Sequence, residues 1–239
     1  QSLKAALLEE RKPEAYSENL IQNYYLDYAS IQAARAMPVL EEGSCLDMCA
    51  APGGKTLVLL SRIKENAEIQ ANELSADRRN RLIRVLDEHL SEETRKRIRV
   101  SSYDASRMPR YGQELYDRIL LDAPCSSERH VLQNEKYLKQ WTEARIKNLS
   151  QRQWALLSAA FLLLKPKGFL VYSTCALADE ENDFLIEKLI KKYKEKVRLE
   201  DKLDNLGPIS PEKTRYGFRF LPDKADGAGP IYFSLIQKN

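Results

Sequence analysis

Two cysteines stand just beyond apolar, strand-like runs and together could carry covalent chemistry. Cys125 ends the run Leu-Leu-Asp-Ala-Pro-Cys, and Cys175 ends the run Leu-Val-Tyr-Ser-Thr-Cys. A thiolate is a nucleophile that adds to an electrophilic carbon and can later leave it. Carbon 5 of a cytosine ring becomes nucleophilic only after such an addition at carbon 6, and a second thiol can help to finish the cycle. The pair therefore points to covalent chemistry on a pyrimidine.

Strand-like and helix-like segments alternate along the part of the chain that must position these thiols. Two late strands, 217–221 and 231–236, have no helix between them and indicate an antiparallel edge. The pattern predicts an α/β, Rossmann-like class I methyltransferase fold: a mostly parallel, seven-stranded sheet with an antiparallel C-terminal edge and helices on both faces. The other expected strands are 44–48, 68–72, 99–102, 116–122 and 169–173, and the expected helices are 55–63, 76–89, 143–164 and 179–192.

The 239 residues suit one sizeable core better than two. Helical spacing at 2–11 and 20–40 predicts that residues 1–40 form a helical extension packed on the core. Residues 41–239 are expected to form the catalytic domain.

Composition narrows the class of protein. Apolar runs are too short to cross a bilayer, so we expect no membrane association. Four cysteines without a secretory signal indicate reduced thiols and an intracellular, cytoplasmic location, or an organellar or nucleolar one in a eukaryote. No Cys-x-x-Cys pair and only two histidines are present, so we expect no metal site. A net charge of +3 means that any RNA contact is local.

Ligands of open α/β sheets bind at the carboxyl ends of the strands. Glu73, Asp104 and Asp122 follow three of the expected strands. A turn with two glycines follows the first and brings backbone amides to a helix N-terminus, where a carboxylate or phosphate is favoured. Its residues are Cys49, Ala50, Ala51, Pro52, Gly53, Gly54 and Lys55.

Cys125 and Cys175 should share one crevice, because their strands are expected to be neighbours in the sheet. For Cys45 and Cys49 we expect ordinary buried thiols. Spacing alone leaves open which thiol attacks the ring.

Three motifs in this order resemble the NOL1/NOP2/Sun (RsmB/NOP) family of S-adenosylmethionine-dependent RNA cytosine-C5 methyltransferases. They are Cys-Ala-Ala-Pro-Gly-Gly-Lys at 49–55, Asp-Ala-Pro-Cys at 122–125 and Tyr-Ser-Thr-Cys at 172–175, and further similarity extends over about residues 20 to 239. The resemblance implies that 49–55 wrap the methionine and ribose of the cofactor.

The resemblance also implies roles for single residues. Glu73 holds the ribose hydroxyls, and Asp104 contacts the adenine. Arg78 is also expected to bind the cofactor, and Asp122 to lie between the cofactor and the target base. Cys175 attacks C6, and Cys125 assists product release.

For the ring chemistry we expect a protonated Asp122 near N3, where it keeps charge from building up. Lys55 or a helix N-terminus would lower the pKa of Cys175. The base that removes the C5 proton is left open between Cys125 and a water molecule.

The substrate is less well defined. The residues Cys-Ser-Ser-Glu-Arg-His at 125–130 resemble those of family members that act on small-subunit ribosomal RNA, sometimes with a protein partner. The resemblance therefore favours ribosomal RNA as the substrate, with tRNA as an alternative. Arg129, His130 and a tyrosine cluster could contact RNA, although core packing is the stronger expectation for Tyr24, Tyr25 and Tyr28.

Three other classes of protein fit the sequence less well. An inactive RNA-binding scaffold on the same fold would fail to bind cofactor. A nicotinamide-dependent oxidoreductase is disfavoured because Gly-x-Gly-x-x-Gly is missing. An amino-group methyltransferase needs no thiol.

Overall fold

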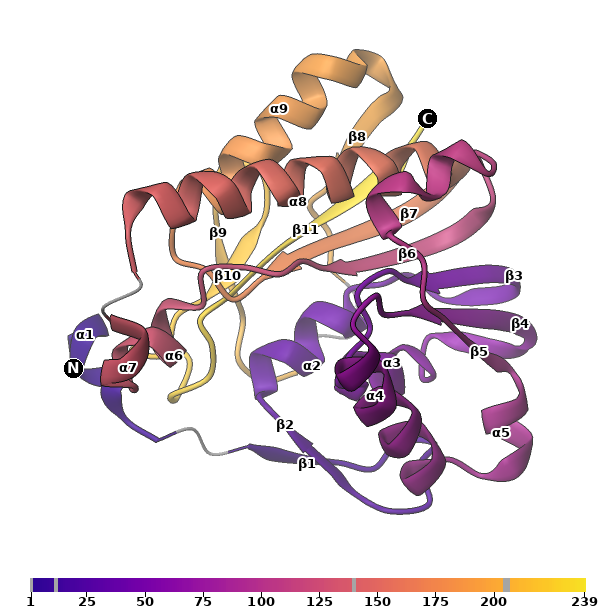
Figure 1. The fold of residues 1–239 in the computed structure, drawn as a ribbon, viewed down its shortest axis with the longest axis horizontal. Coiled ribbons are helices and arrows are strands. Elements are labelled where there is room, and N and C mark those ends of the chain that lie inside the picture. Colours follow the sequence, from indigo (N-terminus) through magenta and orange to yellow (C-terminus); the bar gives the residue numbers. More distant parts are fainter. Residues whose placement is uncertain (1, 11–12, 139–140, 204–206) are drawn as a thin grey trace.

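A single twisted sheet forms the centre of the molecule in the computed structural model, which describes residues 2–10, 13–138, 141–203 and 207–239 (Figure 1). The sheet order is β5-β4-β3-β6-β7-β11-β10-β9, and β8 pairs with β11 beside this path. The first five strands of this order run parallel, and β11 runs antiparallel to β7. The strands are β3 Leu40–Asp47, β4 Ile63–Asn72, β5 Ile98–Ser101, β6 Tyr116–Asp122, β7 Leu164–Thr174, β8 Val197–Glu200, β9 Glu212–Lys213, β10 Phe218–Phe220 and β11 Ile231–Lys238.

Both faces of the sheet are covered, as the buried middle of β6 shows. Leu120 packs with side chains of α2, α3 and α4, whereas Ile119 and Leu121 pack with α8 and α9 on the other face. The predicted α/β architecture is thus confirmed. The helices are α1 Leu3–Leu8, α2 Tyr28–Arg35, α3 Gly54–Leu59, α4 Ala76–His89, α5 Glu92–Lys96, α6 Glu128–Leu132, α7 Glu135–Leu138, α8 Glu143–Leu163 and α9 Asp183–Tyr193, with 3-10 turns η1 Ala105–Arg110, η2 Asp179–Glu181 and η3 Lys194–Lys196.

The described part of the sheet has nine strands rather than the expected seven. The two additional strands, β8 and β9, are short and lie at the antiparallel end. Their sequences, Val-Arg-Leu-Glu and Glu-Lys, carry too few apolar residues for a strand signal, and pairing with an existing neighbour stabilises them. None of the described helices combines the length and apolarity that crossing a membrane requires.

The N-terminal segment is less helical than predicted. The helix expected over 20–40 forms only as α2, because Tyr24–Leu26 (β2) pairs with Glu14–Tyr16 (β1) as a two-stranded sheet. In Figure 1 this hairpin runs beneath α2 and α4, while α1 lies beside α6. Two short helices after β6, α6 and α7, were not expected.

Candidate active site

The loops that follow β6 and β7 bring the two sequence-predicted thiols together. These strands are parallel neighbours with Asp122 opposite Ser173 in the register, and the Ala123 amide donates to the Ser173 carbonyl at 2.8 Å. Both loops therefore leave the same edge of the sheet at the same height. The Sγ atoms of Cys125 and Cys175 lie 2.9 Å apart, which confirms the shared crevice.

The surroundings of the two thiols differ, and this difference favours a thiolate at Cys175. The pKa of Cys175 is lowered first because the Cys125 thiol can donate a hydrogen bond to it. The Ser127 hydroxyl, 3.3 Å from Cys175 Sγ, and the charge of Lys55 lower the pKa further, and together these effects outweigh burial, which raises it. The pKa of Cys125 is raised well above its ordinary value by its hydrogen bond to Cys175 and by burial. Ser127 was missed in the sequence, although it stands two residues after Cys125.

Lys55 and Asp122 form an ion pair beside the thiols. Lys55 Nζ lies 2.8 Å from Asp122 Oδ2, and the Ser173 hydroxyl donates to Asp122 Oδ1 at 2.8 Å. Burial alone would lower the pKa of Lys55, but the nearby Asp122 outweighs it and the pKa is raised. Both carboxyl oxygens of Asp122 therefore face a hydrogen-bond donor, and the expected proton on Asp122 near N3 of a bound cytosine stays a prediction.

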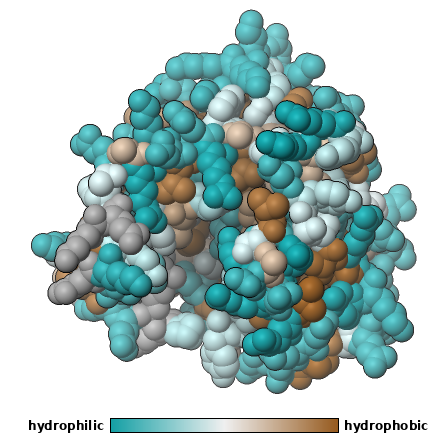
Figure 2. Space-filling view, in the orientation of Figure 1, coloured by the Kyte–Doolittle hydropathy of each residue, from teal (hydrophilic) through white to brown (hydrophobic). Residues whose placement is uncertain are grey.

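A pocket of about 380 Å³ connects the thiols to the other strand ends. In Figure 2 the surface is hollowed between α8 above and α4 below. One end of the pocket is lined by Cys125 and Cys175, and the other by Glu73 and Asp104. Its volume falls within the range of small-molecule and cofactor sites.

Glu73 presents a buried oxygen in this pocket that could accept a hydrogen bond from a ligand. Its side chain is 6% exposed, its Oε1 accepts from the Ser75 amide, and its Oε2 is buried without a hydrogen-bond partner. Arg78 Nη1 lies 3.4 Å from that oxygen, and Arg78 Nη2 donates to the Ala51 carbonyl at 2.7 Å. A buried acceptor at the end of β4 is suited to a ribose hydroxyl, and Arg78 holds the 49–55 turn.

The turn at 49–55 keeps its backbone open to a ligand. Cys49, Ala51 and Pro52 line the pocket of the thiols. Gly53 has φ +119°, a left-handed conformation that favours glycine, and a Cβ on Gly54 would lie 2.7 Å from Tyr24. Ala50, Gly54 and Lys55 line an adjoining pocket of about 310 Å³.

Asp104 caps η1 and lines the thiol pocket. Its Oδ1 accepts from the Ser106 amide at 3.1 Å, and Arg107 Nε lies 3.3 Å from its Oδ2. It lines the same pocket as Glu73, and its contact with the adenine stays a prediction.

Asp47, at the end of β3, is a buried acid that the sequence analysis missed. It is 1% exposed and lines the second pocket. The Thr56 hydroxyl donates to its Oδ2 at 2.6 Å, and its Oδ1 has no hydrogen-bond partner. Burial raises the pKa of Asp47 to about 7, against the effect of the Thr56 bond.

This raised pKa predicts a pH dependence of stability. Unfolding returns the Asp47 carboxyl to its ordinary pKa of about 4. Between about pH 4 and pH 7 the folded chain therefore holds this proton more tightly than the unfolded chain does. The bound proton therefore stabilises the folded state fully at pH values below the pKa of Asp47 in the unfolded chain. This stabilisation is lost as the pH rises through the pKa of Asp47 in the folded chain. In urea titrations across this window, the free energy of unfolding should therefore fall by up to about 4 kcal/mol more for the wild type than for Asp47→Asn. Parallel pH profiles would contradict this, and Asp77→Asn, at an exposed carboxylate on α4, is the control.

Several proposed RNA contacts change on the folded chain. Arg129 is 1% exposed and donates to the carbonyls of Glu9, Gly227 and Gly229, so its role as a surface contact is wrong. His130 is exposed and packs on Tyr137.

Of the three tyrosines proposed to pack in the core or to contact RNA, two are packed and one is exposed. Tyr28 is buried in the core, and Tyr24 packs edge-on against His89, as expected. Tyr25 is 62% exposed and does not pack in the core. Cys45 is fully buried, and among the described residues no cluster of His, Cys, Asp or Glu could hold a metal.

Comparisons with known proteins agree with this geometry. The family model of the 16S rRNA methyltransferase RsmB/F matches residues 35–236. The 5-cytosine rRNA methyltransferase NSUN4 of Bos taurus is 35% identical over 87% of this chain and 59% of its own length. The mitochondrial tRNA (cytosine(34)-C(5))-methyltransferase of Danio rerio is 31% identical over 92% and 61%.

A solved structure agrees as well. NSun6 from Pyrococcus horikoshii, solved with SFG, has a TM-score of 0.77 at 27% identity over 96% of this chain and 56% of that one. This chain spans about 60% of the length of the two curated relatives named above. Matched over most of its length by the family model, the chain belongs to the 16S rRNA methyltransferase RsmB/F family, within the NOL1/NOP2/Sun group that its motifs resemble.

Proposed function

We propose that this chain transfers a methyl group from S-adenosylmethionine to C5 of a cytosine in RNA. The observation that carries the proposal is the pair of thiols 2.9 Å apart, next to the Lys55–Asp122 ion pair and at one end of a cofactor-sized pocket. Amino-group transfer would use neither thiol. The names of the relatives, several of them 5-cytosine methyltransferases, support the same reaction.

The cofactor fits the part of the pocket that extends from the thiols to Glu73 and Asp104. Glu73 Oε2, buried without a hydrogen bond, suits a ribose hydroxyl, Asp104 at the same end of the pocket suits the adenine, and the open turn at 49–55 suits the methionine part. NSun6 was solved with SFG, an analogue of the cofactor. When bound, the cofactor supplies an electrophilic methyl group to C5.

Covalent catalysis follows from the positions of the side chains. The Cys175 thiolate adds to C6, forming an S–C6 bond and pushing the C5–C6 electron pair toward N3. The Lys55–Asp122 pair lies beside Cys175, where it can hold the polar edge of the ring and limit the developing charge. After methylation a base removes the C5 proton, and the S–C6 bond breaks. Cys125, in contact with Cys175, is our candidate to assist that release.

The substrate class we favour is ribosomal RNA, on the names of the NSUN4 and RsmF relatives, with tRNA second on the name of the Danio rerio relative. Because the thiols are partly buried in the pocket, the target base must leave its stack to reach them. Unstacking costs a few kcal/mol, and least in a loop. A protein partner that directs the chain to its RNA is part of this proposal.

A tritium-release assay tests the reaction and its position on the ring. Ribosomal RNA and tRNA, each transcribed with cytidine tritiated at C5, are incubated with the chain and S-adenosylmethionine. Methylation at C5 displaces the tritium into water, whereas methylation of the amino group does not. We expect cofactor-dependent release, and more from ribosomal RNA.

Two results would contradict the proposal. Methyl transfer without tritium release would indicate another position on the base. Absence of any calorimetric binding of S-adenosylmethionine would favour the inactive scaffold.

A further inference from the structure

We propose that Glu128 and Glu181 form a reciprocal clasp that sets the spacing of the two thiols. The first cysteine loop, residues 123–127, ends in α6, and the second, residues 175–178, ends in η2. Each loop is followed by a buried glutamate whose carboxylate binds a backbone amide of the other loop. We call these two residues the clasp glutamates; neither was assigned a role from the sequence.

The first tie runs from the second loop to the first. Glu181 is fully buried, and its Oε2 accepts from the Ser126 amide, directly after Cys125, at 3.0 Å. Gln153 of α8 donates to the same oxygen at 2.6 Å and to the Pro124 carbonyl at 2.9 Å. Glu181 therefore fixes the backbone on both sides of Cys125.

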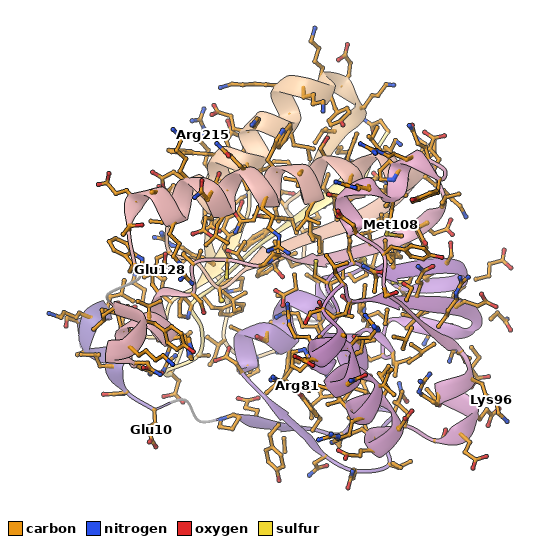
Figure 3. The ribbon with its side chains drawn as sticks, viewed as in Figure 1. Glu10, Arg81, Lys96, Met108, Glu128 and Arg215 are labelled. Carbon is orange, nitrogen blue, oxygen red and sulfur yellow. The ribbon has the colours of Figure 1, made fainter. Side chains whose placement is uncertain are left out.

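The second tie runs in the opposite direction. Glu128, labelled in Figure 3 on α6, is 8% exposed, and its Oε2 accepts from the Leu177 amide at 3.0 Å. The Ser126 hydroxyl donates to its Oε1. Glu128 thus holds the loop of Cys175 from the side of Cys125.

The sheet ends just before the thiols. On β6 it ends at Asp122, three residues before Cys125, and on β7 it ends at Thr174, which pairs with Tyr232 of β11 directly before Cys175. Loop residues without such ties open locally at a lower free energy than the strands that precede them. Charge-assisted bonds from buried carboxylates to backbone amides are short and strong, and breaking one leaves a buried amide unsatisfied.

The clasp glutamates act on the chemistry through the cysteines, so they are positioning residues. A shift of about 1 Å at a reacting group can cost about 100-fold in rate. The kinetic consequence rests on the proposed function, whereas the thiol spacing does not depend on it.

Thiol oxidation measures the spacing directly. Diamide, an azo compound, accepts a first thiolate at its N=N bond; the second thiolate then attacks the bound sulfur, giving a disulfide and the reduced hydrazine. The rate of disulfide formation is measured by mass spectrometry after alkylation of the remaining thiols. In the wild type we expect the Cys125–Cys175 disulfide to form rapidly. Glu181→Leu should slow it at least about tenfold and lower kcat for methyl transfer by about 100-fold, with the KM for S-adenosylmethionine within about threefold.

Matched variants isolate the clasp. Glu181→Gln keeps an acceptor for the Ser126 amide and should restore most of both rates. Glu180→Leu removes the neighbouring exposed carboxylate and should change neither rate. Continued protection of the buried Cys45 from alkylation shows that a variant is folded.

Each outcome is decisive. Wild-type oxidation and kcat in Glu181→Leu would overturn the clasp, as would an equal loss in Glu181→Gln. Should Glu181→Leu not fold, Glu128→Leu cuts the second tie alone and is judged by the same criteria. Slowed oxidation in a chain whose wild type methylates no RNA would support the clasp and reject the proposed function.

Discussion

Replacement of Cys175 by alanine is expected to abolish methyl transfer, lowering kcat by at least about 10³-fold. C5 of cytosine is too weak a nucleophile to accept the methyl group until a thiolate has added at C6. Cys175 is the thiol whose pKa is lowered. In the variant Cys125 loses its hydrogen bond to Cys175, but burial still raises its pKa, so Cys125 is not expected to take over the attack. The measurement is single-turnover tritium release from the RNA.

The control for this variant is another thiol of the same chain. Cys45→Ala removes a buried sulfur from β3, away from the pockets, and should leave kcat unchanged. Cys175→Ala should still bind S-adenosylmethionine by calorimetry, because Glu73 and the turn at 49–55 are untouched. Retention of even a tenth of wild-type kcat would refute covalent attack by Cys175.

Replacement of Cys125 by alanine is expected to trap the RNA on the protein. The Cys125 thiol lies 2.9 Å from Cys175, where it can assist departure of the sulfur from C6. Without it the Cys175 thiolate is still favoured by Ser127 and Lys55, so addition and methylation proceed, more slowly, while the S–C6 bond persists. Turnover should therefore fall by about 10² to 10³-fold. The adduct should appear as a slowly migrating band that survives denaturation and disappears after RNase treatment.

The double replacement provides the control for trapping. Cys125→Ala combined with Cys175→Ala removes the attacking thiol and should give no band. Normal turnover without an adduct in Cys125→Ala would assign release to another group, such as a water molecule.

The fold was largely predictable because its signals are local. Apolar runs such as 116–122 are recognisable without knowledge of their neighbours, and β6 occupies those residues. Elements that depend on their partners were missed or misassigned: β8 and β9 form only against existing strands, and Tyr24–Leu26 pairs in a hairpin despite its helical spacing.

The site divides in the same way. Glu181 follows Asp179 and Glu180, a run that in the sequence resembles acids at the start of a helix, and nothing local marks it as fully buried. Only the folded chain shows that Lys55 and Ser173, which are distant from Asp122 in the sequence, both donate to it. Arg129 beside the catalytic motif suggested an RNA contact, yet distant carbonyls enclose it.

The sequence by itself determined most of the strands and helices along the chain, the motifs that carry Cys125 and Cys175, and through them the family, because these depend on residue identity and short-range spacing. The tertiary structure decided what depends on contacts across long sequence separations. It places the two sulfurs 2.9 Å apart, surrounds Cys175 rather than Cys125 with groups that favour a thiolate, and buries Asp47 and the clasp glutamates. Burial and hydrogen bonding set the charge state of such groups, and both exist only once the chain has folded.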